Sequence, residues 1–100
     1  MLAAAATALV LLHGSVTIGP TTPTCKVSCT KPAAHVLLEF IRYGHLKMAT
    51  TDAHGRYSVL ITPGTWKVVA TRGISAVPER FIVRAVTTQK RNFFLDNRLR

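Results

Sequence analysis

Apolar and polar residues alternate along most of this chain, which indicates β-strands rather than helices. Successive side chains of a strand point to opposite faces, so an alternation with a period of two marks one buried and one exposed face. About seven such strands, at the spacing of a β-sandwich, predict an all-β fold: a small antiparallel Greek-key β-sandwich. We expect the strands in residues 14–20, 35–44, 45–51, 56–62, 65–71, 80–86 and 93–95.

The chain starts with an almost wholly apolar run, MLAAAATALVLL, in which Thr7 is the polar residue. It is shorter than the ~20 apolar residues needed to cross a bilayer, but it has the length of the apolar region of a signal peptide. No basic residue precedes it and no clear cleavage site follows it, so a clipped start or a short membrane-associating helix is an alternative. We expect residues 1–13 to form a signal-peptide-like or anchoring segment with a short apolar helix, and residues 14–100 to form the sandwich.

Two turn signals lie within TTDAHGRYSVLITPGTWKVVAT, residues 50–71. The side chain of Asp52 is expected to accept backbone N–H groups of its turn, and Gly55 is expected to supply a positive φ. Pro63 and Gly64 fit a tight turn. We therefore expect the alternating runs on either side of Pro63 and Gly64 to pair as an antiparallel hairpin.

The alternation in these two runs also predicts core residues. Tyr57 lies on the apolar face of the first run, and Trp66 shares a face with Val68 and Ala70 in the second. An exposed Trp66 could stack on a sugar ring, but its register with apolar neighbours favours the core.

The same stretch resembles the carboxypeptidase regulatory-like domain, which has the prealbumin (transthyretin-like) β-sandwich architecture. The opening GSVTIGP resembles the first strand of exported bacterial members. The resemblance implies a non-catalytic accessory or surface module. Hydrolases of oxidised urate on a related fold carry a Tyr-Arg-Gly-Ser motif, whereas this chain reads NFFLDNRLR. The family signature, T-D-x-x-G-x-[FY]-x-h-x-h-x-P-G-x-[YW]-x-h with h apolar, is matched in order by Thr51, Asp52, Gly55, Tyr57, Val59, Ile61, Pro63, Gly64, Trp66 and Val68.

The two cysteines, Cys25 and Cys29, lie close together in TCKVSCTKP. An even number of cysteines in a small exported chain favours a disulfide between them. Two free thiols and half of a metal site are the alternatives. The metal site would need two further ligands, and no pair of the four histidines has zinc-ligand spacing, so we expect no metal.

The charge is strongly basic, with 13 Lys and Arg against 4 Asp and Glu and a formal net charge of +9. Such a surface attracts anions, although plain solvated charge explains it equally simply. Arg80, Arg84, Lys90 and Arg91 are the candidate anion-binding residues, with an anionic glycan or cell-surface polymer as partner. Nucleic acid is a less favoured partner because no aromatic binding motif accompanies the cations.

The sequence offers no set of catalytic residues and implies no cofactor. Asp52, His54 and Arg56 share one turn, but the Asp-x-x-Gly pattern already gives Asp52 a backbone role. No serine lies in a Gly-x-Ser-x-Gly setting. We therefore expect a non-enzymatic secreted or cell-surface accessory module. A basic polyanion-binding domain and a small hydrolase on the same fold are the alternatives, and a cytoplasmic location follows if residues 1–13 are not a signal.

Overall fold

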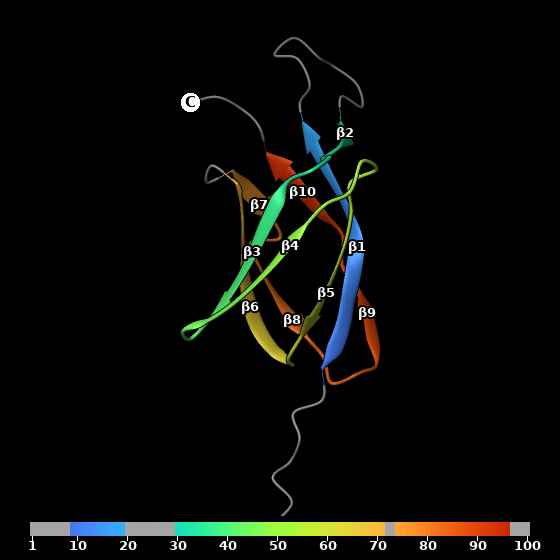
Figure 1. Ribbon diagram of the computed structural model, residues 1–100. Coiled ribbons are helices and arrows are strands. Elements are labelled where there is room, and N and C mark those ends of the chain that lie inside the picture. The colour runs from blue at the N-terminus through green and yellow to red at the C-terminus, as the bar shows by residue number, and fades with distance from the viewer. Residues whose placement is uncertain (1–8, 20–29, 72–73, 97–100) are drawn as a thin grey trace, which may run out of the picture.

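The computed structural model describes residues 9–19, 30–71 and 74–96, and the regular elements in these ranges are strands in two facing sheets (Figure 1). The ten strands of the described residues are β1 (Val10–Gly19), β2 (Lys31–Pro32), β3 (Leu37–Arg42), β4 (His45–Thr50), β5 (Arg56–Ile61), β6 (Gly64–Ala70), β7 (Ser75–Val77), β8 (Arg80–Val83), β9 (Thr88–Lys90) and β10 (Phe93–Asp96).

One sheet has four antiparallel strands in the order β4-β3-β6-β8, and the other has six strands arranged around β1. β1 pairs antiparallel with β5 and β2, and parallel with β9 and β10, while β7 extends the sheet beyond β10. The expectation of an all-β sandwich of two sheets is confirmed. The expectation of a purely antiparallel fold is wrong, because β1 has two parallel partners.

The core lies between the sheets, where their inward side chains meet. Phe40 and Phe81 of the four-stranded sheet face Tyr57 and Phe93 of the other, with ring centroids 5.3 Å apart for Phe81 and Phe93 and 6.0 Å apart for Phe40 and Tyr57. Trp66 is 1% exposed, and its indole N–H donates to the carbonyl of Thr62 at 2.9 Å. Aromatic rings in such contact contribute beyond the area that they bury.

The N-terminal boundary of the sandwich lies before residue 14, because β1 begins at Val10. Val10 and Leu12 have no exposed surface, whereas Leu9 is 49% exposed and Leu11 37% exposed. Inward and outward residues therefore alternate within the apolar run, which is strand geometry. The expected helix is wrong for residues 10–12, and residues 1–8 lie outside the described residues.

The expected hairpin at Pro63 and Gly64 is also wrong. β5 pairs with β1 in one sheet, and β6 pairs with β3 and β8 in the other, so this connection crosses between the sheets. Both runs do point their apolar residues inward, but they do so from opposite sides of the core. The hairpin forms instead between β3 and β4, where Tyr43 and Gly44 have φ values of 39° and 79°.

The sequence pattern predicts fewer strands than the ten found in the described residues. β2, β7 and β9 were not expected, and each has only two or three residues. A strand of that length is too short to show an alternation of apolar and polar residues. These strands are therefore recognised only by their pairing with β1 or β10 in the structure.

Candidate functional site

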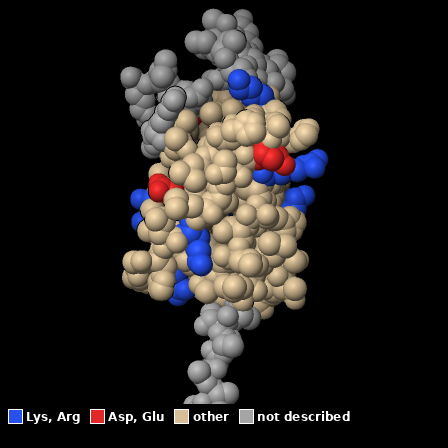
Figure 2. Space-filling model, viewed as in Figure 1, with Lys and Arg blue, Asp and Glu red and all other residues tan. Residues whose placement is uncertain are grey.

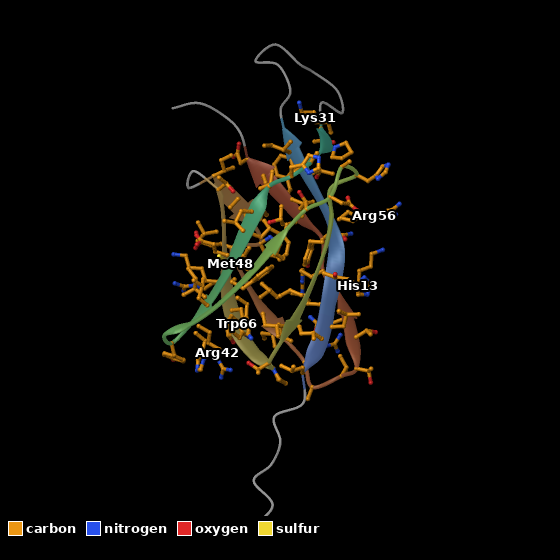
Figure 3. The ribbon with its side chains drawn as sticks, viewed as in Figure 1. His13, Lys31, Arg42, Met48, Arg56 and Trp66 are labelled. Atoms are coloured by element: carbon orange, nitrogen blue, oxygen red, sulfur yellow. The ribbon has the colours of Figure 1, made fainter. Side chains whose placement is uncertain are left out.

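A hollow of about 610 Å³ opens on the outer face of the four-stranded sheet. Ile41 of β3, Lys67 of β6 and Arg80 of β8 lie side by side across three strands in one row. Arg42 and Trp66 of the lining are labelled in Figure 3. The residues that line the hollow, hereafter the groove, are Ile41, Arg42, Tyr43, Thr65, Trp66, Lys67 and Arg80.

Lys67 and Arg80 are direct cross-strand neighbours in the groove. Side chains at such positions start about 4.5–5.5 Å apart, and like charges placed there destabilise a sheet. The described residues that line the groove include no carboxylate, and the nearest acid along β3 is Glu39, in the next outward row. An anion held between Lys67 and Arg80 would relieve their repulsion.

Arg42 and Tyr43 form one wall of the groove at the end of β3. The Nη1 of Arg42 donates to the carbonyl of Pro63 at 2.8 Å, which ties this strand to the connection between β5 and β6. Tyr43 is 93% exposed in the turn that follows. The groove therefore combines the guanidinium of Arg42, which is fixed by a hydrogen bond, with the solvent-exposed ring of Tyr43.

The four cations expected to bind anions do not share one face. Only Arg80 lines the groove. Arg84 follows β8, where its N–H donates to the side-chain oxygen of Gln89, and Lys90 lies beside His13 in the other sheet. The guanidinium of Arg91 lies 5.8 Å from the centre of the Phe81 ring. Figure 2 shows the Lys and Arg side chains of this view as separate areas rather than one continuous patch.

The residues that join Arg80 in the groove could not be chosen from the sequence. Lys67 is visible as an outward position of its strand, but its neighbour across the sheet depends on the strand order β3-β6-β8. Arg42 falls on the inward parity of β3 and enters the lining because it lies at the strand's end.

The Asp52 carboxylate is used by its own turn. Its Oδ1 accepts the N–H groups of His54 at 2.8 Å and Arg56 at 2.9 Å, and these hydrogen bonds, that of Arg56 first, lower the pKa of Asp52 below its ordinary value. Gly55 has a φ of 78°, and its carbonyl accepts the N–H of Val16. His54 and Arg56 are exposed.

Thr51 is a further structural residue of this turn, and the family signature includes it without giving it a role. It is 2% exposed, and its hydroxyl donates to the carbonyl of Ala33 while accepting the N–H of Val36 at 2.8 Å. The threonine that precedes the aspartate in the signature was the available signal.

The Tyr57 hydroxyl is a structural donor. It donates to the carbonyl of Arg91 at 2.6 Å, and burial raises the pKa of Tyr57 far above its ordinary value. A Cβ on Gly14 would lie 2.1 Å from that same carbonyl, so glycine is what allows β1 to approach it. The Tyr57 phenol therefore stays protonated at neutral pH and serves the core.

The remaining predicted features concern cysteines, metals and membranes. Cys25 and Cys29 lie outside the described residues. Within the described ranges, no group of three or more His, Cys, Asp or Glu residues is placed to hold a metal ion. A search of those same ranges finds no helix with the length and apolar character needed to cross a bilayer.

A scan against protein-family models finds no match to this chain, and a search of curated proteins finds none either. A solved structure does share its fold. That structure is a DUF3823 family protein from Parabacteroides merdae, with a TM-score of 0.55 and 13% sequence identity. The match covers 89% of this chain but only 46% of the solved chain, so this chain spans under half of that protein. At this identity the likeness concerns the fold alone.

Proposed function

We propose that the chain is a sandwich module of the carboxypeptidase regulatory-like kind, with prealbumin-like Greek-key topology. The places of the signature residues support the assignment. Asp52 and Gly55 build a turn, Gly64 opens β6 after a crossing between the sheets, and Tyr57 and Trp66 are both buried.

The function that we propose is non-enzymatic binding of an acidic glycan in the groove. The observation that carries it is the direct pairing of Lys67 with Arg80, with Arg42 beside them and no carboxylate among the described lining residues. Two adjacent cations suit a carboxylate or sulfate group, which accepts charge-assisted hydrogen bonds from both.

Tyr43 supports a sugar rather than a bare anion as ligand. Its ring is 93% exposed at the rim of the groove, next to Arg42. A tyrosine combines an apolar ring face with a polar hydroxyl, which suits the mixed surface of a sugar. An acidic polysaccharide offers both features in each repeating unit.

We further propose that the module acts outside the cytoplasm, as a secreted or cell-surface protein. The apolar run before β1 and the pair Cys25 and Cys29 support this. Because Val10 and Leu12 are core residues, the apolar residues before β1 act in this proposal as an anchoring segment that stays on the chain, rather than as a signal peptide removed at residue 13. Mass spectrometry of the exported protein should find the residues before Val10 still attached, and a mature chain starting after Leu12 contradicts the proposal.

The groove is tested by titrating the chain with polygalacturonate, heparin, neutral dextran and a DNA duplex. We expect binding to the acidic polysaccharides and none to dextran. The double variant Lys67→Gln/Arg80→Gln should bind about a hundredfold more weakly, because each of the two lost charge-assisted hydrogen bonds contributes about 1.5 kcal/mol.

The matched control is Arg84→Gln/Lys90→Gln, which removes the same charge outside the groove. Equal losses in both variants would mean that net charge alone attracts the polymer, and would overturn the groove as the site. Preferred binding of the DNA duplex with a steep salt dependence would indicate phosphate binding instead. Tyr43→Ala should weaken polygalacturonate binding without changing its salt dependence.

A further inference from the structure

Four partly exposed apolar side chains gather at the end of the six-stranded sheet where β1 begins. Leu9 is 49% exposed, Leu11 37%, Leu60 53% and Val86 44%. Leu11 lies directly beside Leu60 of β5, and its N–H donates at 3.0 Å to the carbonyl of Thr87, the residue after Val86. Leu9 lies two residues before Leu11 and so shares its face. These four residues form one surface, hereafter the apolar end.

The next row of the same outer face is polar and basic. His13 lies between Ser58 of β5 and Lys90 of β9, and Arg56 follows beside Ser15. The outward positions of β5, β1 and β9 in these rows hold no carboxylate, and Asp52 lies beyond Arg56 at the far end of β5. With increasing distance from the apolar end, the outward side chains of this face therefore change from apolar to polar and basic.

We infer that the apolar end sits in the interface of an anionic lipid membrane. A surface with apolar groups at its tip and basic residues behind them matches the depth profile of a bilayer, where acyl chains lie below negatively charged headgroups. Lys90 stands one row behind the tip, and Arg84 lies in the β8–β9 connection that leads to Val86.

The sequence that precedes the apolar end is also compatible with a membrane interface. Residues 1–8 read MLAAAATA and contain no charged side chain, and they continue directly into Leu9. In Figure 2 the surface at this end of the sandwich is mostly tan, with no acidic side chain visible. A second copy of the chain is a poorer occupant, because facing two such ends would bring Lys90 and Arg84 of both copies together.

The experiment measures flotation of the full chain with vesicles of phosphatidylcholine alone and of an equimolar mixture with phosphatidylglycerol. We expect binding to the mixed vesicles. The triple variant Leu9→Ser/Leu60→Ser/Val86→Ser should partition at least about tenfold more weakly, because three apolar side chains no longer enter the interface. Lys90→Gln should weaken binding to the mixed vesicles by about fivefold and leave binding to pure phosphatidylcholine unchanged.

The matched control is Leu46→Ser/Met48→Ser/Ile82→Ser, which removes three similarly exposed side chains from the outer face of the other sheet. It should bind vesicles as the unmodified chain does. The inference is overturned by no binding of the unmodified chain, by full binding of the apolar-end triple variant, or by equal losses in both triples. A fall in molecular mass in solution for the apolar-end triple variant would assign this surface to a second copy and overturn it too.

Discussion

Two connections carry the chain from one sheet to the other in the middle of the sequence, and they are held in different ways. The first, between β4 and β5, contains Asp52 and Gly55 and is closed by hydrogen bonds to the Asp52 carboxylate. The second, between β5 and β6, contains Pro63 and is held by the guanidinium of Arg42, which comes from β3, 21 residues away in the sequence.

This difference explains why one turn is readable from the sequence and the other is not. An Asp-x-x-Gly turn contains its own acceptor, so its conformation follows from neighbouring residues. A Pro-Gly pair fixes a bend but not the sheet to which the next strand belongs. In this chain the bend at Pro63 is held by the side chain of Arg42, and nothing in the sequence pattern links these two residues.

The largest effect should come from a side chain placed at the first connection. Gly55→Ala combines a φ of 78° with a Cβ only 2.6 Å from the carbonyl oxygen of Val16, and that oxygen belongs to the backbone of the central strand. We expect a loss of about 3–4 kcal/mol in the free energy of unfolding. Urea denaturation measures it.

Gly44→Ala is the control for that variant. Gly44 has nearly the same φ, 79°, but a Cβ there meets nothing within 4 Å. It should cost only about 1 kcal/mol. If the two variants lose equal stability, the contact with Val16 does not matter and the first connection is held by its φ alone.

A smaller effect is expected at the second connection. Gly64→Ala places a Cβ against the guanidinium of Arg42 at a φ of 140°. The flexible end of Arg42 can move away, so the cost should be about 2 kcal/mol, mostly from the backbone conformation. A loss as large as that of Gly55→Ala would show that both connections are equally rigid.

The loss of stability from Arg42→Ala and its coupling energy with Gly64→Ala should both be smaller than the loss from Gly64→Ala alone. Arg42→Ala removes the hydrogen bond to Pro63 and should cost about 1 kcal/mol. In this background Gly64→Ala should cost about 0.5 kcal/mol less than in the unmodified chain, because the contact is gone and only the larger backbone strain is left. A double-mutant cycle in urea measures this coupling, and strictly additive losses would contradict it.

The smallest effect belongs to the Asp52 side chain. Asp52→Ala leaves the exposed N–H groups of His54 and Arg56 to water, so the loss of stability should be smaller than that of each glycine variant and of Arg42→Ala. The folded-state pKa of Asp52 lies below its ordinary value of 3.8. The stabilisation is therefore present above that value and is lost as the pH falls through the folded-state pKa. Unfolding curves of both chains should converge at low pH, and a gap that persists there would contradict this role.

Much of the fold was predictable from single positions. The inward places of Tyr57 and Trp66 follow from alternation, because their strands are long enough to show it. β1 shows the limit of that rule. Its first part is apolar on both faces, so the run that contains Val10 and Leu12 reads equally well as the apolar region of a signal peptide.

The groove was less predictable than the fold, for a physical reason. Lys67 and Arg80 lie 13 positions apart and become neighbours only through the pairing of β6 with β8. A run of cations along the sequence, such as Lys90 and Arg91, need not form a patch. Lys90 stands outward beside His13, whereas the guanidinium of Arg91 reaches the Phe81 ring.

The parallel pairing of β1 with β10 sets where a covalent extension leaves the molecule. β1 begins near one pole and β10 ends near the other, and Val16 to Gly19 run beside Phe93 to Asp96 in the same direction (Figure 1). The 10 residues of β1 alone span about 33 Å. A protein segment fused before Leu9 and another fused after Asp96 would therefore be separated by the length of the paired strands β1 and β10. On a domain with adjacent termini the two segments would lie close together.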